Sequence, residues 1–206
     1  MGENKDNYDR EIGMKKWKVA IASIAVLGGC ASGLSANIDM PISTGISAMQ
    51  FNSVASQYMR RPTFVSVQHY PSGEEVMTIE RDDYGVRDKY GAEATSRIWF
   101  DRSGAKVIAD ATNKYFEWET QASEAGDIFA KDIAKTKSIK GGAVQVGFAS
   151  GSGSQHYLTL EFCALGACLA DSALFFDRAG AEALKEVLTD FAEGKIKAEN
   201  VSSKYN

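Results

Sequence analysis

The sequence contains an internal match, and this match constrains the fold more than any other feature of the chain. The decapeptides that begin at Ser96 and Ser172 share Phe-Asp-Arg-x-Gly-Ala at an offset of 76 residues, and most of their flanking apolar positions match in kind. Two further blocks match in the same order: Thr78-Ile79-Glu80 with Thr159-Leu160-Glu161 at an offset of 81, and Val65 and Val67 with Val144 and Val146 at an offset of 79. Collinear matches at a nearly constant spacing indicate that one supersecondary unit is present twice.

Both units predict the same order of elements. Strands are predicted over 63–70, 76–81 and 94–100 and again over 143–149, 157–163 and 169–176, and the first strand of each set has alternating valines. After each third strand the apolar spacing becomes helical, and Asp101 and Asp177 are suited to cap the helices that follow. The predicted fold is α+β, with two tandem βββα repeats, or ββββα if 51–58 and 129–137 add outer strands. We expect antiparallel sheets that are each packed by one helix, with the repeats related by a pseudo-twofold axis.

The order ββββα resembles the layout of tandem Whirly and PUR-type modules. The resemblance is in element order only, and it therefore carries little functional weight. An open sheet with aromatic residues could bind single-stranded nucleic acid by stacking. However, no Lys or Arg occurs between Gly141 and Phe176, where only Glu161 and Asp171 are charged. Because phosphate contacts need cations, these uncharged strands favour burial against the first unit or against a protein partner.

The first thirty residues have the features of an export signal. A basic cluster (Lys15, Lys16 and Lys18) precedes an apolar run from Val19 to Leu27 that ends in small residues. The run is shorter than the roughly 20 residues of a membrane-spanning helix. We expect residues 1–29 to be a signal peptide. Residues 1–13 have mixed charges that fit no signal, so Met14 is a candidate start.

Leu27-Gly28-Gly29-Cys30 resembles the lipobox of bacterial lipoproteins. The resemblance implies cleavage before Cys30, acylation of its thiol and amino group, and a membrane anchor; a buried segment with an incidental cysteine is the alternative. Ala31 follows the cysteine, and by resemblance to enterobacterial lipoproteins it implies the outer membrane, facing the periplasm. We expect residues 30–60 to be the lipidated cysteine and a tether whose later part docks or adds a strand. Repeat units at 61–126 and 127–194 and a flexible tail at 195–206 follow.

Cys163 and Cys168 flank a predicted turn of four residues in the second unit. Cysteines on both sides of a hairpin turn can approach within disulfide range, and an exported chain favours oxidation. A redox pair or two metal ligands are the alternatives, although redox motifs usually have two intervening residues and no His-Cys set completes a zinc site. A C-x4-C hairpin also occurs in the exported invasion-associated locus B family, and the resemblance covers this turn alone.

The duplicated polar pairs, Asp101-Arg102 and Asp177-Arg178, allow two interpretations. In the first, each aspartate caps a helix and each arginine lies on the surface or pairs across the twofold axis. In the second, the two helix N-termini form a symmetric ligand or partner site. No motif nominates a catalytic residue, a metal site or a cofactor site. The loop Ser150–Ser154 lacks the lysine and the helix of a phosphate-binding loop, and we treat His69 and His156 as strand side chains.

These observations predict a lipid-anchored periplasmic binding or structural module that engages a protein partner at the cell envelope without catalysis. The composition, 44% hydrophobic and 24% charged with a net charge of −4, is that of a globular protein. An inhibitor or immunity lipoprotein that neutralises a hydrolase or toxin is the alternative. Single-stranded nucleic-acid binding is a lesser one, and the acidic balance gives it no support. An enzyme would need a deep pocket with converging polar side chains.

Overall fold

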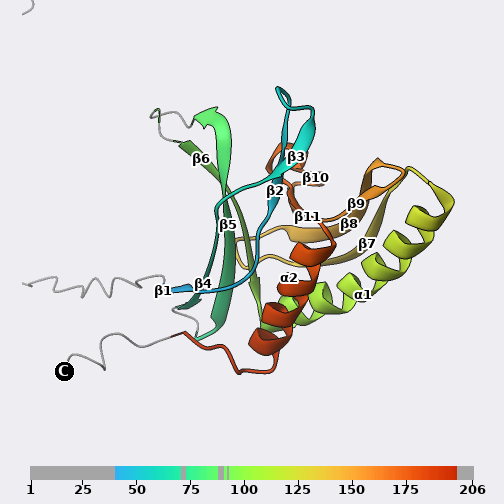
Figure 1. The fold of residues 1–206 in the computed structure, drawn as a ribbon. Helices are drawn as coiled ribbons and strands as arrows, with labels where there is room; N and C mark the ends of the chain where they lie inside the picture. Colours follow the sequence, from blue (N-terminus) through green and yellow to red (C-terminus); the bar gives the residue numbers. More distant parts are fainter. Residues whose placement is uncertain (1–39, 71–72, 88–90, 92, 199–206) are drawn as a thin grey trace, which may run out of the picture. The chain divides into compact units, whose positions relative to one another are not determined.

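The computed structural model describes residues 40–70, 73–87, 91 and 93–198, which form two antiparallel sheets and two long helices (Figure 1). The first sheet has the order β1 (Met40–Ile42), β4 (Thr63–His69), β5 (Glu75–Arg87) and β6 (Glu93–Asp101). The second has the order β3 (Gln57–Arg60), β2 (Met49–Asn52), β11 (Leu174–Phe176), β9 (Gln155–Ala164), β8 (Ala143–Ser152) and β7 (Ala130–Lys137), with β10 (Ala167–Cys168) paired to β9. The helices are α1 (Arg102–Ala125), α2 (Arg178–Ala192) and the short 3-10 turn η1 (Ala170–Ser172). The predicted α+β class with antiparallel sheets is confirmed.

Strand order and register coincide in the two halves. The order β1-β4-β5-β6 precedes α1, and the order β7-β8-β9-β11 precedes α2. Ile79 of β5 lies between Val65 and Ile98, just as Leu160 of β9 lies between Val146 and Leu174. All of these side chains are buried in the core.

The register changes one of the alignments made from the sequence. Val144 lies opposite Phe162, and the residue opposite Leu160 is Val146. By pairing, Val65 therefore corresponds to Val146, at an offset of 81 rather than 79. A slide of two residues keeps the same face of a strand inward, so alternation alone cannot distinguish the two alignments.

Residues 40–60 belong to the fold. β1 is an edge strand of the first sheet and pairs with β4. β2 and β3 form a hairpin that joins the second sheet through β11. The outer strand predicted over 51–58 is thus a hairpin, whose turn closes when the Asn52 side chain accepts hydrogen bonds from the backbone N–H groups of Val54 and Ala55. Of the predicted tether, residues 30–39 lie outside the described residues, as does the signal segment. The last predicted strand, 169–176, is divided into η1 and β11.

The helices do not pack one to a sheet. α1 contacts β5 and β6 of the first sheet but also β7, β8 and β9 of the second, and it lies beside α2 (Figure 1). α2 contacts β9 and β11. A short sheet with one helix leaves much apolar surface exposed, and the two halves instead bury their apolar residues in one shared cluster. Phe100, Tyr115, Phe176 and Phe191 are fully buried within it.

Candidate functional site

The shared Phe-Asp-Arg-x-Gly-Ala motif has the same structural role at both helix starts. Asp101 accepts a hydrogen bond from the N–H of Gly104 at 2.7 Å, and Asp177 accepts one from Gly180 at 2.8 Å. A Cβ added to Gly104 would lie 2.9 Å from the Cβ of Phe100, so the first helical turn has room only for glycine. The motif phenylalanines and alanines are buried in the core. The aspartates are therefore helix N-caps, as predicted.

Each motif arginine contacts the other helix. The guanidinium of Arg102 lies 4.5 Å from the ring centre of Phe191 in α2, and it also pairs with Glu75. Arg178 lies 5.3 Å from the ring centre of Phe116 in α1 and pairs with Glu119 of the same helix. Both guanidinium groups thus hold α1 and α2 together, and a capping carboxylate already occupies each helix N-terminus. This geometry favours the structural interpretation of the pairs over an anion site.

An open cleft of about 520 Å³ lies at the start of α1. Its charged or titratable lining residues are His69, Glu74, Glu75, Asp101, Arg102 and Lys197. Burial raises the pKa of Glu75, but the hydrogen bonds from Arg102 and from the N–H of Ala198 outweigh it and hold that pKa below its ordinary value. Among the described residues, no group of three or more His, Cys, Asp or Glu side chains is arranged to hold a metal ion. The charges of this cleft serve mainly to join elements of the fold.

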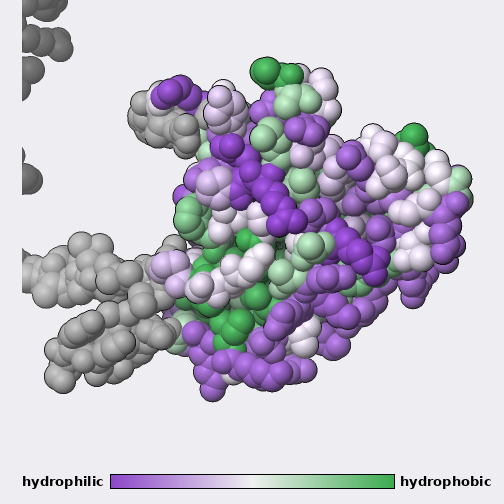
Figure 2. All heavy atoms as spheres, in the orientation of Figure 1, coloured by the Kyte–Doolittle hydropathy of each residue, from purple (hydrophilic) through white to green (hydrophobic). Residues whose placement is uncertain are grey.

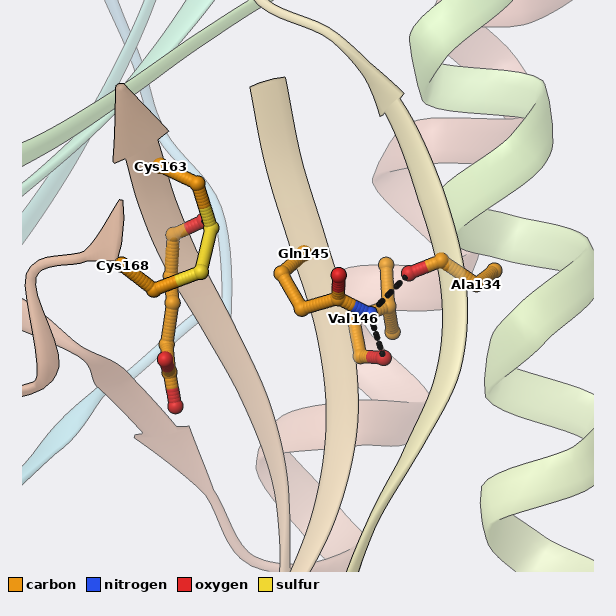
Figure 3. Close-up of a disulfide and its surroundings, with 6 residues drawn as sticks. Ala134, Gln145, Val146, Cys163 and Cys168 are labelled. Atoms are coloured by element: carbon orange, nitrogen blue, oxygen red, sulfur yellow. Dashed lines mark hydrogen bonds between the residues drawn. A yellow bond between two sulfur atoms is a disulfide. The ribbon is translucent and has the colours of Figure 1, made fainter. Parts of the chain in front are cut away.

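Cys163 and Cys168 form a disulfide across the β9–β10 hairpin (Figure 3), which confirms the predicted pairing. The two cysteines are paired in register, with their Cα atoms 3.9 Å apart. The turn consists of Leu165 and Gly166, whose φ angles of 52° and 84° are both left-handed, as in a type I′ turn. Leu165 is fully exposed at its tip. Next to this hairpin, the Gln145 side chain of β8 donates to the carbonyl of Ala134 at 2.8 Å and stiffens the neighbouring strand pair (Figure 3).

A cleft that sequence reasoning missed lies between the β2–β3 hairpin and β5. We call it the hairpin cleft, and its volume is about 230 Å³. Its lining residues are Gln50, Phe51, Asn52, Ser53, Val54, Met59, Arg61, Tyr84 and Gly85. Four of the side chains are apolar and strongly exposed: Phe51 (53%), Val54 (94%), Met59 (41%) and Tyr84 (62%). Figure 2 shows apolar atoms at the tip of this hairpin.

Polar contacts fix the two sides of the hairpin cleft. The N–H of Tyr84 donates to Oε1 of Gln50 at 2.8 Å, and the guanidinium of Arg61 lies 5.0 Å from the ring centre of Tyr84. The available signal in the sequence was a set of isolated apolar residues in a segment of Gln, Asn and Ser. Such residues indicate that the segment docks on the domain or adds a strand, but they do not indicate that β5 lies opposite.

Two polar groups, Arg81 and the His156–Ser150 pair, lie in the interior of the fold. Arg81 is 1% exposed and donates to Asp83, to Ser96 and to the carbonyls of Met49 and Ala173, so it joins the two sheets. Its donors are satisfied within the protein, which indicates a structural role.

His156 is also buried, and its Nδ1 lies 2.9 Å from the hydroxyl of Ser150. That hydroxyl accepts a hydrogen bond from the N–H of Phe129 as well, and the hydroxyl of Tyr115 donates to the carbonyl of His156. Burial raises the pKa of Tyr115. The His156 ring is stacked on Phe148 inside the protein, so its contacts with Ser150 and Phe148 join neighbouring parts of the fold.

The remaining predicted site residue, Cys30, lies outside the described residues. None of the helices in the described part of the chain is long and apolar enough to cross a membrane. No protein-family model, no curated protein and no solved structure matches the chain.

Proposed function

We propose that this protein is a non-catalytic, lipid-anchored module of the bacterial cell envelope that engages a protein partner through the hairpin cleft. The lipobox Leu27–Cys30, with the lysines and the apolar run before it, supports the anchor. The main support for a protein partner is an exposed apolar cluster around one cleft, formed by Phe51, Val54, Met59 and Tyr84. Clustered exposed apolar side chains on a folded domain are typical of interaction surfaces.

The hairpin cleft lies at a distance from the place where the chain enters the described fold. The chain enters the described fold at Met40, which pairs with Val67, and Val67 pairs with Met77 near the start of β5. Tyr84 lies seven residues beyond Met77 on the same strand, a distance of about 23 Å at roughly 3.3 Å per residue.

The two halves of the fold are, in this proposal, tandem copies of one unit related by a pseudo-twofold axis. Equal strand order, the equivalent registers of Ile79 and Leu160, and the shared roles of the two caps support it. The β2–β3 hairpin extends only the second sheet. A partner that binds the hairpin cleft therefore meets one site for each chain rather than two symmetric sites.

An inhibitor or immunity lipoprotein is the second candidate, and one observation favours it. The disulfide-closed β9–β10 hairpin presents Leu165 as a convex tip, the shape that enters the concave site of a hydrolase or toxin. The partner distinguishes the two candidates. A single secreted hydrolase supports the inhibitor, whereas a stable complex of envelope proteins supports the structural module.

The hairpin cleft is tested with Val54→Lys and a matched control, Ile128→Lys, which alters a 69% exposed residue in the α1–β7 connection. Proteins are crosslinked in intact cells and purified through the lipoprotein. We expect the wild type and Ile128→Lys to yield the same discrete complex, and Val54→Lys to lose it while its thermal unfolding is unchanged. If Val54→Lys keeps the complex at full yield, the hairpin cleft is not the binding surface.

The anchor is tested with Cys30→Ser and with a globomycin-type inhibitor of lipoprotein processing. Several acyl chains hold a protein firmly in a membrane, because each buried methylene contributes about 0.8 kcal/mol. We expect either treatment to leave the protein unprocessed or outside the outer-membrane fraction. Unchanged processing and attachment of Cys30→Ser would contradict the lipobox.

A further inference from the structure

Leu165 is at a position that the fold itself does not favour for leucine. Its φ of 52° is left-handed, and the first position of a type I′ turn is normally Asn, Asp or Gly because these residues adopt that conformation easily. The side chain is fully exposed, so it gains no burial that would offset the strain. A residue in an unfavourable backbone conformation, with no contact in its own domain that offsets the strain, is expected at functional positions.

The disulfide holds this tip in one shape. Cys163 and Cys168 are paired directly across the hairpin, only one residue from each end of the Leu165-Gly166 turn region. The base is also tightly packed, because a Cβ on Gly142 would lie 2.2 Å from the carbonyl oxygen of Cys163. A rigid tip loses little conformational freedom on binding, which raises the affinity available from one apolar side chain.

The surroundings of Leu165 identify the kind of surface that covers it. Between Gly141 and Phe176 the only charged residues are Glu161 and Asp171, so this stretch of the chain supplies no cation to an anionic lipid surface or a nucleic acid. Leu169, which is 52% exposed, adds apolar surface close to the hairpin. A single convex side chain on a narrow turn is covered by a pocket and not by a flat surface. In the view of Figure 1, β10 lies on the same side of the domain as the β2–β3 hairpin.

We infer that Leu165 is an anchor residue of the partner interface, and that the partner is a protein with a concave apolar pocket that accepts this side chain and has no anionic rim. The inference rests on the proposed function, because it names the shape and chemistry of the protein partner. It adds a binding residue outside the hairpin cleft, and it assigns the strained turn and its disulfide the task of presenting that residue.

The test uses full-length protein in intact cells, with a photo-crosslinking amino acid at Leu169, at Val54 or, as a control, at Ile128. Each is placed in three backgrounds: wild type, Leu165→Met and Leu165→Asn. Asn is favoured in the turn, so Leu165→Asn is expected to fold and to raise the melting temperature by about 2 °C. In this background we expect the crosslinked adduct at Leu169 to fall at least tenfold, whereas Leu165→Met, which keeps an apolar tip, retains it. The adduct is located by mass spectrometry beside an apolar pocket of the partner.

Each outcome has a separate meaning. An adduct at Leu169 that persists in Leu165→Asn overturns the anchor role, and the proposed function still stands. An adduct at Val54 without one at Leu169 also overturns the anchor role and leaves the proposed function standing. Adducts at neither position, or equal adducts at Ile128, contradict the proposed function itself. Adducts with lipid at Leu169 overturn the inference in favour of a membrane contact. A lower melting temperature for Leu165→Asn contradicts the strain that the inference requires.

Discussion

At the residue scale, Gly142 provides a sharp test of the packing under the disulfide hairpin. Its φ of 75° is left-handed, and an added Cβ would lie 2.2 Å from the carbonyl oxygen of Cys163. Gly141 has a similar φ of 83° but open space around it. We expect Gly141→Ala to cost about 1 kcal/mol from backbone strain alone. Gly142→Ala should lower the free energy of unfolding by about 3 kcal/mol, because the backbone must also move. Urea unfolding measures both, and equal losses would contradict the close approach.

Arg81 is the residue for which removal of one partner should cost most. Replacing it with methionine leaves the Asp83 carboxylate buried without its cation, and such losses are about 3–5 kcal/mol. The double variant Arg81→Met/Asp83→Asn should lose less than Arg81→Met alone, because no buried charge remains. Arg97→Met, at an exposed pair with Glu80 on the same sheet, should cost below about 1 kcal/mol. Chemical unfolding of these variants checks the ranking, and a loss for Arg81→Met as small as that for Arg97→Met would refute it.

Residues with local partners could be predicted from the sequence, and residues with distant partners could not. The caps Asp101 and Asp177 bond to N–H groups three residues away, and Cys163 and Cys168 face each other across one turn. Arg81 instead depends on the carbonyls of Met49 and Ala173, which are 32 and 92 residues away in the chain. A charged residue in a strand gives no sign of such partners, so its burial was not anticipated.

At the element scale, the strands with strong alternation and both helices follow the sequence pattern closely. The exceptions are elements defined by few contacts. β11 is three residues long and makes a single registered pair with β2, so no pattern predicts that the β2–β3 hairpin extends the second sheet. The hairpin cleft depends on that placement, because β5 forms its other side. Strand type was predictable here, but strand partnership was not.

The two helix caps predict a similar loss of stability at both helix starts. Asp101→Ala removes the acceptor for Gly104, and Asp177→Ala removes the acceptor for Gly180. Each alanine variant should lower the free energy of unfolding by about 1 kcal/mol. The corresponding Asn variants should keep most of the wild-type stability, because Asn also caps helices. Asp177→Ala should lose slightly more, because that carboxylate also pairs with Arg60 at 2.8 Å. Thermal and urea unfolding measure the effects. Alanine variants as stable as the Asn variants would exclude a capping role.

At the scale of the whole molecule, the two halves depend on each other. The long helix α1 follows the first sheet yet packs on the second, and Arg102 and Arg178 each join one helix to the other. The repeated motif predicts two similar units. The side chains that join the units do so through individual contacts across the core, and such contacts leave no pattern along the sequence. The expected burial of one unit against the other is present as one shared cluster of buried residues, whereas the expected packing of one helix on each sheet is not.

Glu75 connects the most distant parts of the fold. Its carboxylate lies at the start of β5, pairs with Arg102 of α1, accepts a hydrogen bond from the N–H of Ala198 at 2.9 Å, and has His69 of β4 at 3.9 Å. Glu74, Asp101 and Lys197 line the same cleft. Arg102 continues the connection to the carbonyls of Phe191 and Ile196. Loss of the Glu75 charge should therefore loosen α1, the end of α2 and the C-terminal segment together.

This connection makes stability depend on acid in a defined direction. The pKa of Glu75 in the fold is below its ordinary value of 4.5, so the folded state binds its proton less readily than the unfolded chain does. The stabilisation is fully present above pH 4.5 and is lost as the pH falls through the lowered folded pKa. Glu75→Gln should cost about 2 kcal/mol at pH 7 through its lost charged hydrogen bonds. It should also make the melting temperature less dependent on pH as the pH falls below about 4.5. Glu80→Gln, at an exposed pair on the same strand, should leave most of that dependence in place. If Glu75→Gln keeps the full acid dependence of the wild type, another carboxylate controls it.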